Sequence, residues 1–309
     1  MKYVKSLIKT LFSKNNIGFI AFMMLNIAPI CIAFAYKSLL YALLAFVVLF
    51  VLYFLFVMAI GEVVARIMLR ANTRVRLIER NVLSVAFSNA YTIAKRKNDI
   101  ISGNIRLFIF EGGVIDGYAF GRNTLCLSSA SLNLPEQDLT TLLMMKFAQF
   151  SHHDSELLAI LTAGNVWYVA LAVICKWYIY VAGFITWLIM ACLGYGSRLF
   201  GGFVLGRIFK AMAEGTEKII LIFVKAIMML GVGSYKNNVY INDEFVCDCG
   251  YKNGLIRFLQ DFEPEQIGQE TLFGAINSMK PDKHIRLSKV QNYNPTTTEN
   301  SSGFRIIRR

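Results

Sequence analysis

Two long apolar stretches near the N-terminus predict a helical hairpin that crosses a membrane. Residues 17–36 and 38–60 contain no charged side chain, and each is long enough to cross a hydrocarbon core of about 30 Å as a helix. Only Lys37 separates them, which predicts a tight turn at the far membrane surface. A cleavable signal peptide would instead have a shorter apolar run followed by small residues at a cleavage site.

A second apolar block predicts two more crossings. It covers residues 157–197 and is interrupted only by Lys176. A single helix of that length would run about 60 Å, twice the thickness of the hydrocarbon core. The block either breaks near Lys176 into a hairpin, or crosses once and returns through the weaker run 219–233, which contains Lys225. Both arrangements predict four crossings in all, with the amphipathic residues 196–218 at the membrane surface.

Composition favours a membrane protein over a soluble enzyme or a nucleic-acid binder. Hydrophobic residues make up 56% of the 309 and charged residues only 17%, whereas soluble domains carry about 25% charged residues. The net charge is +12, and lysine and arginine gather on the cytoplasmic segments of membrane proteins. Two basic clusters flank the first hairpin, and only Glu62 and Glu79 oppose them: Lys2, Lys5, Lys9, Lys14, Arg66, Arg70, Arg74, Arg76 and Arg80.

The charge pattern predicts the orientation. Both flanks of the first hairpin, and with them the N- and C-termini, are expected in the cytoplasm. Arg66, Arg70 and Arg74 have i, i+4 spacing, which is typical of one solvated or headgroup-facing helix surface. The six scattered cysteines fit buried free thiols in a reducing compartment rather than a disulfide framework.

The predicted fold class is an α-helical membrane protein of about four spans with a small α+β cytoplasmic domain. Five segments follow from the pattern: a membrane hairpin at 1–60, a cytoplasmic part at 61–156, a second membrane region at 157–234, a second cytoplasmic part at 235–290, and a disordered basic tail at 291–309.

The first cytoplasmic part predicts strands followed by a helix. Residues 104–128 read as two strands around a glycine-containing turn. Asn133 is a candidate N-cap, Pro135 suits a first turn, and Glu136 and Asp138 favour the helix dipole. Apolar residues then recur at helical spacing: Leu139, Leu142, Leu143, Phe147 and Phe150. In the second part, Glu244 and Asp248 have i, i+4 spacing on a helix predicted to continue to Leu259.

The order of these motifs resembles the HtpX-type integral-membrane zinc metallopeptidases. The resemblance covers residues 1–290. It implies that Tyr118-Ala119-Phe120-Gly121-Arg122-Asn123 forms a strand on the substrate side of a peptide cleft. Glu244-Phe245-Val246-Cys247-Asp248 matches the family's E-[FY]-x-x-D motif, whose glutamate is the third zinc ligand. The segment 278–287 is similar to the S-T-H-P…R-I ending of the family. The implied fold is a zincin-like domain between membrane spans, and the implied location is a bacterial cytoplasmic (inner) membrane.

The chain departs from the family where the chemistry would be. HExxH supplies two histidines for zinc and a glutamate as general base, but the aligned residues are Lys146-Phe147-Ala148-Gln149-Phe150. Glu244 alone cannot hold zinc, which needs three or four donors. We therefore expect no catalytic residue, no bound metal and no cofactor. We expect Lys146 to lie at the former metal position and to pair with Glu244. The order of the motifs also implies that the helices at 136–150 and 242–259 pack together.

Polar residues near the degenerate motif are candidates to replace the missing zinc ligands. His152, His153 and Asp154 follow the degenerate motif, and His152 and Glu156 have i, i+4 spacing. His152 lies six residues beyond Lys146, which predicts the opposite helix face, and interfacial histidines are the simpler interpretation. His284 is expected at the surface, and Cys247 and Cys249 are expected to be structural thiols.

Three hypotheses on function follow. The first is a membrane-embedded, HtpX-like pseudoprotease that binds or regulates a protein partner at the cytoplasmic membrane face. The second is an active membrane zinc metalloendopeptidase with a displaced ligand set. The third is a structural or transport component of a membrane assembly. The expected partners are the lipid bilayer, an unknown membrane or cytoplasmic protein and a second copy of the chain, but no nucleic acid.

Overall fold

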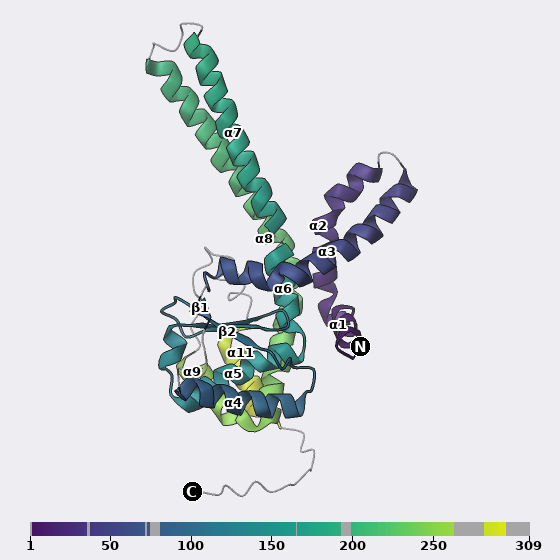
Figure 1. Cartoon of the computed structure of the whole chain (residues 1–309), viewed down its shortest axis with the longest axis vertical. Helices are drawn as coiled ribbons and strands as arrows, with labels where there is room; N and C mark the ends of the chain where they lie inside the picture. The colour runs from purple at the N-terminus through teal and green to yellow at the C-terminus, as the bar shows by residue number, and fades with distance from the viewer. Residues whose placement is uncertain are drawn as a thin grey trace, which may run out of the picture.

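Two helical hairpins project from one end of a globular part that contains a small sheet (Figure 1). This computed structural model describes residues 2–35, 38–71, 73–74, 81–164, 166–192, 199–262 and 281–294. The prediction of a mostly helical chain with a small α+β domain is confirmed. Lys37 and residues 295–309 lie outside the described residues.

The first hairpin is formed by α2 (Ile17–Ala35) and α3 (Leu39–Met68), which pack against each other. A short amphipathic helix, α1 (Lys2–Leu11), and a 3-10 turn, η1 (Lys14–Asn16), precede it. The lower end of α3 packs closely on the next hairpin, because a Cβ added at Gly61 would lie 3.1 Å from the Ala159 methyl group.

The second hairpin is longer and begins inside the globular part. α6 (Asp154–Gly164) leads into α7 (Val166–Cys192), and α8 (Leu199–Val246) returns along α7 (Figure 1). Because α7 continues through Lys176, a hairpin break near that residue is wrong, and the return runs through 219–233 inside α8. Residues 199–218 belong to the same helix, with Phe209 against Gly183 of α7, so they do not form a separate surface helix. The Lys225 side chain lies outside the described part.

Two helices among the described residues are long and apolar enough to cross a membrane: α3, and Ala172–Met190 of α7. Their apolar side chains are exposed instead of buried. In the most apolar 18-residue window, 11% of residues are buried in α3 and none in α7. A core helix of a soluble protein would bury such residues, because exposed apolar surface is unfavourable in water.

The sheet has four strands in the order β1-β2-β4-β3. The strands are β1 (Thr73–Arg74), β2 (Arg106–Phe110), β3 (Gly117–Phe120) and β4 (Thr124–Ser128). β2 and β4 are parallel, while β3 pairs antiparallel with β4 and β1 with β2. Segment 104–128 therefore holds three strands, not two, because residues 111–116 return the chain to the other side of β4.

The two faces of the sheet contact different apolar clusters. Alternating residues of β3 illustrate this, because Tyr118 and Phe120 pack toward the base of the hairpins while Ala119 faces the helices of the globular part. Those helices are α4 (Asn81–Lys97), α5 (Glu136–Ser151), α9 (Lys252–Asp261) and α11 (Lys283–Asn292). The sheet is thus covered on both faces.

The helix α5 begins later than the sequence suggested. Asn133 lies in a 3-10 turn, η3 (Ala130–Asn133), and Pro135 occupies the N-cap position, so the prediction of an Asn133 cap is wrong. Glu136 and Asp138 do lie in the first turn. The predicted apolar positions are all buried: Leu139, Leu142, Leu143, Phe147 and Phe150.

The prediction that segments 136–150 and 242–259 pack together is confirmed, because α5 contacts both α8 and α9. The second segment is not one helix, however. A π-helical turn, η4 (Cys247–Tyr251), separates α8 from α9, and Gly250 within it has a φ of 86°. At the α5–α9 contact, a Cβ on Gly254 would lie 2.5 Å from the Thr141 hydroxyl, so only glycine permits this approach.

Four smaller predictions also have outcomes. Arg66, Arg70 and Arg74 do not share a helix face, because α3 ends at Met68, Arg70 has a φ of 54° and Arg74 is in β1. His284 is exposed, as expected. The tail cannot begin at 291, because α11 continues to Asn292. All six cysteines are free, but only Cys126 and Cys247 are buried and Cys192 is exposed, so the prediction of buried thiols holds for two of them.

Glu62 joins the first hairpin to the sheet. Its carboxylate accepts hydrogen bonds from the backbone N–H groups of Arg122 and Asn123 at 2.7 and 3.0 Å and from the Thr124 hydroxyl at 2.8 Å. Arg106 also forms an ion pair with it at 3.0 Å. Gly121 has a φ of 54°, and a Cβ there would collide with the Glu62 side chain. This glycine therefore permits both the turn and the contact.

Candidate functional site

Lys146 is buried and pairs with Asp116. Its side chain is 4% exposed, and its Nζ lies 3.7 Å from Asp116 Oδ1. It passes under β3, because a Cβ on Gly117 would lie 3.4 Å from Lys146 Cε. Asp116 is buried too, and its carboxylate accepts a hydrogen bond from the N–H of Gly117 at 2.8 Å. An ammonium and a carboxylate therefore face each other between α5 and the sheet.

The prediction that Lys146 pairs with Glu244 is wrong. Glu244 is exposed and lies near the end of α8, where it lines a small hollow with Tyr240, Lys289 and other residues of α8 and α11. The helix turns Asp243, not Glu244, toward the interior, and Asp243 forms a buried bidentate pair with Arg286 at 2.8 and 2.9 Å. Asp248 is held separately, by Lys97 at 3.4 Å and by the Tyr293 hydroxyl at 3.0 Å.

The other positions aligned with HExxH belong mainly to the core. Phe147 and Phe150 are buried, and the Phe147 ring lies edge-on to Phe87 of α4 at 5.4 Å. Ala148 is buried as well, and Gln149 is partly buried. The face of α5 that would carry zinc ligands therefore packs against apolar side chains.

The strand proposed as a peptide-binding edge is covered. Tyr118, Ala119, Phe120 and Gly121 are all buried, and helix α6 packs against this strand. The Gly121 N–H donates to the carbonyl of Ser155 in α6 at 2.8 Å. An extended peptide could pair with β3 only if α6 moved away. Arg122 is exposed and Asn123 is partly buried.

Polar side chains meet where α6 enters the hairpin region. Asp154 is 2% exposed, and its carboxylate accepts hydrogen bonds from Asn238 at 2.8 Å and Asn242 at 2.5 Å. Burial raises the pKa of Asp154 to about 7, although both hydrogen bonds act in the opposite direction. The His152 Nδ1 lies 2.9 Å from the Asn242 side-chain oxygen, and burial lowers the pKa of His152.

His153 and Glu156 extend this buried polar group toward α1. The His153 ring is 1% exposed and its Nδ1 lies 3.4 Å from Glu156 Oε1. The Tyr3 hydroxyl of α1 donates to the same oxygen at 2.5 Å, and Tyr3 contacts the His153 ring edge-on at 5.1 Å. The interpretation of these histidines as interfacial is therefore too simple, because both lie in contacts that join α1, α6 and α8.

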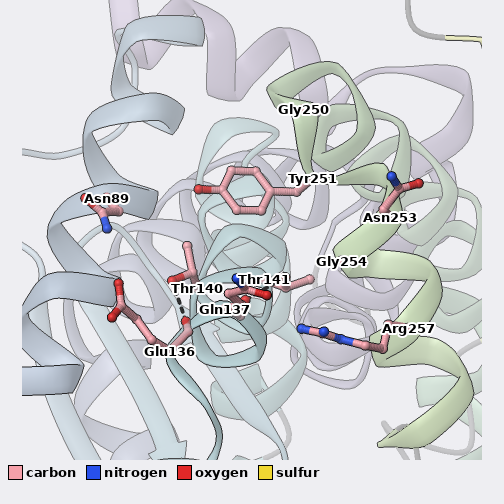
Figure 2. A pocket seen from close by; sticks show the side chains of 10 residues that line it. All are labelled: Asn89, Glu136, Gln137, Thr140, Thr141, Gly250, Tyr251, Asn253, Gly254 and Arg257. Atoms are coloured by element: carbon pink, nitrogen blue, oxygen red, sulfur yellow. Dashed lines mark hydrogen bonds between the residues drawn. The ribbon is translucent and has the colours of Figure 1, made fainter. Parts of the chain in front are cut away.

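A polar groove between α4, α5 and α9 is an open candidate site. Its volume is about 530 Å³. Figure 2 shows Tyr251 and Arg257 reaching from the α9 side toward α5, with Asn89 of α4 on the opposite wall. Amide, hydroxyl and charged groups line it: Asn89, Glu136, Gln137, Thr140, Thr141, Tyr251, Asn253 and Arg257.

The chemistry of the groove suits hydrogen bonding rather than a reaction. The Thr140 and Thr141 hydroxyls donate to the carbonyls of Glu136 and Gln137 at 2.6 and 2.9 Å. The Arg257 Nε donates to the buried carboxylate of Asp138 at 2.8 Å, which holds the guanidinium in place. Burial and the neighbouring Cys249 raise the pKa of Tyr251, so its phenol stays protonated at neutral pH.

No group of three or more histidine, cysteine, aspartate or glutamate side chains among the described residues is arranged to hold a metal ion. The donor set at Lys146 does not fit zinc, because an ammonium beside Asp116 would repel a divalent cation. No protein-family model, no curated protein and no solved structure matches the chain.

Several residues of the buried polar contacts and of the groove were not predicted from the sequence. Asn238 and Asn242 have i, i+4 spacing, which placed two amides on one helix face and could have indicated a buried polar contact. Asp116 carried a weaker signal, as one of two acidic residues, with Glu111, in the segment 104–128. No feature of the sequence indicated that Arg257 would reach Asp138, because 119 positions separate them.

Proposed function

We propose that this protein is a membrane-embedded, non-catalytic relative of the HtpX-type metallopeptidases that binds a protein partner at the cytoplasmic membrane face. The observation that carries the proposal is the buried Lys146–Asp116 pair at the position that the resemblance assigns to a zinc ligand. A fixed cationic side chain takes the place of a metal there. The core packing of Phe147 and Phe150 supports the same conclusion.

The membrane part of the proposal rests on the exposed apolar helices. α2, α3, α7 and α8 form two hairpins that leave the same end of the globular part (Figure 1). Four crossings would bring both chain ends and the whole globular part to one side of the bilayer. The basic residues at the base of the first hairpin favour the cytoplasmic side.

The binding part of the proposal rests on the groove between α4, α5 and α9. It is open, polar and outside the hairpins, so a partner could reach it from the aqueous side. Since β3 is covered, we place the partner in this groove and not along the strand.

Two measurements test catalysis. The protein, purified in detergent, should contain far less than one zinc per chain by elemental analysis, and it should not cleave casein. One zinc per chain, with casein cleavage that a chelator abolishes, would favour the active-peptidase hypothesis and refute the proposal.

Photo-crosslinking in the native membrane tests partner binding. A photoreactive residue at Asn89, on the wall of the groove, should give a discrete crosslinked species. The matched control is Asp99, whose side chain is 95% exposed just beyond the same helix. Equal crosslinking at both positions, or none at Asn89, would contradict binding in the groove.

A further inference from the structure

The N-terminal helix α1 has an apolar stripe that the chain leaves exposed. Leu7 and Leu11 are buried against the protein, whereas Val4, Ile8 and Phe12 are 55%, 49% and 62% exposed. These three residues are spaced by four, so they line one side of the helix and the turn that follows it. The stripe is separate from the leucine contact that holds α1 in place.

Basic residues flank this stripe. Lys2, Lys5 and Lys9 are exposed, and on a helix they lie beside the stripe, on the side away from the buried leucines. No acidic residue precedes Glu62 in the sequence. An amphipathic helix with an apolar stripe and a lysine flank is typical of helices that lie in the headgroup layer of an anionic bilayer.

The position of α1 suits that layer. The helix lies at the base of the first hairpin (Figure 1) and leads through η1 directly into α2. The buried Asn16 side chain accepts a hydrogen bond from Asn238 of α8 at 3.0 Å, which fixes this turn. On α1 itself, the Tyr3 hydroxyl donates a hydrogen bond to Glu156. The Arg122 guanidinium lies over the Tyr3 ring, 4.4 Å from the ring centroid. The helix is therefore held beside the point where the hairpin begins.

We propose that α1 is a docking surface for the anionic headgroup layer of the bilayer, with Val4, Ile8 and Phe12 inserted at the acyl boundary and the lysines against lipid phosphates. The inference rests on the proposed membrane embedding of the hairpins. A lipid occupant is favoured because the stripe continues into Ile17, which is 59% exposed at the start of α2. The charge of the flank is complementary to anionic lipid.

Tryptophan quenching in reconstituted bilayers tests the proposal. The full chain is prepared with Trp167, Trp177 and Trp187 replaced by phenylalanine, and a single tryptophan is introduced as Ile8→Trp. Lipids brominated near the headgroup end of the acyl chain should quench this probe more strongly than lipids brominated near the methyl end. Two control proteins carry Leu52→Trp in the middle of α3 and Asn89→Trp in the groove.

The controls separate the two proposals. If Leu52→Trp is quenched by deep bromines while Ile8→Trp resembles Asn89→Trp and stays unquenched, the docking of α1 is refuted and the embedding stands. If Leu52→Trp is also unquenched, the proposed embedding itself has failed. Stronger quenching of Ile8→Trp by lipids brominated near the methyl end of the acyl chain would contradict a position in the headgroup layer.

Lipid charge tests the role of the lysines. Quenching at Ile8→Trp should be stronger in bilayers containing phosphatidylglycerol than in phosphatidylcholine alone. Each of Lys2→Gln, Lys5→Gln and Lys9→Gln is expected to lower the docked-to-undocked ratio about fivefold in the anionic bilayer. Equal quenching in both lipids, unaffected by these substitutions, would refute recognition of anionic headgroups.

Discussion

The hairpins and the globular part of this protein place their side chains in opposite ways. Along α3 and α7, leucine, valine, isoleucine and aromatic side chains are exposed, and Val47, Leu52 and Trp177 are 60%, 56% and 67% exposed. In the globular part, ions are buried instead, since the side chains of Arg286 and Asp243 are 2% and 6% exposed. Exposed apolar side chains are unfavourable in water, so the contrast favours hairpins that lie in lipid and a globular part that lies in water.

Removing one half of the buried ion pair should have the largest effect. Arg286→Met keeps most of the side-chain volume but leaves Asp243 buried without its guanidinium. Breaking such a pair destabilises a protein by about 3–5 kcal/mol. Thermal unfolding in detergent measures the loss, and adding Asp243→Leu should restore part of it. The ion pair of Lys95 with Asp99, whose side chain is 95% exposed, provides the control, since Asp99→Asn should change little. An equal loss in both variants would show that burial does not distinguish the pairs.

A charge placed on the exposed face of a hairpin should have the next largest effect. Leu52→Arg lies near the middle of α3, where an arginine in lipid costs about 2.5–3.5 kcal/mol on insertion scales. The matched control is Val85→Arg, on a residue of α4 that is 45% exposed in the globular part. The fraction of protein that resists extraction from membranes should fall for Leu52→Arg only. If both variants behave like the parent, α3 does not face lipid.

The pH dependence of stability should show that the buried carboxyl of Asp154 has a raised pKa. Its pKa is raised from the usual 3.8 to about 7 by burial, so the folded protein holds this proton more tightly than the unfolded chain. Its contribution therefore favours folding most at low pH, declines as pH rises from about 4 to 7, and is constant above that. Asp154→Asn should remove this slope. Melting temperatures of the parent and the Asp154→Asn protein are compared between pH 4 and 8. Profiles of the same shape would contradict a buried Asp154 carboxyl with a raised pKa.

The smallest expected effect is at Glu244. Because this side chain is exposed, Glu244→Ala should change the free energy of unfolding by no more than about 0.5 kcal/mol. Lys146→Met, by contrast, leaves the buried Asp116 without its ammonium and should be clearly destabilising. A large loss from Glu244→Ala, non-additive with Lys146→Met, would instead support the pairing of Lys146 with Glu244.

The sequence was informative where periodicity governs the structure. The hairpin helices and the apolar face of α5 follow from runs of apolar residues, and the contact of α5 with the end of α8 followed from the order of motifs. The close contact between the two hairpins did not, because it depends on tertiary structure, in which Gly164 packs closely against Tyr53 and Phe22 of the first hairpin.

The candidate sites were less predictable than the helices. The i, i+4 spacing of Glu244 and Asp248 suggested a shared helix face, but α8 ends between them and Asp248 lies in the π turn Cys247–Tyr251. The residue of α8 that is turned inward is Asp243. The partner of Lys146 depended on a loop between β2 and β3 whose path no local pattern specifies. Burial of a charge is a property of the assembled fold, so residue type and spacing alone could not identify these pairs.

The helix α8 runs without interruption for 48 residues, from Leu199 at the tip of the second hairpin to Val246 beside the groove. At 1.5 Å per residue it is about 72 Å long. The inner end carries Asn238 and Asn242, which both donate to the carboxylate of Asp154, and Asp243, which pairs with Arg286 of α11. A thinner or thicker bilayer changes the tilt of a spanning helix. In the proposed membrane embedding, a change in the tilt of α8 would move the π turn and the α9 wall of the groove together, because α8 leads directly into both.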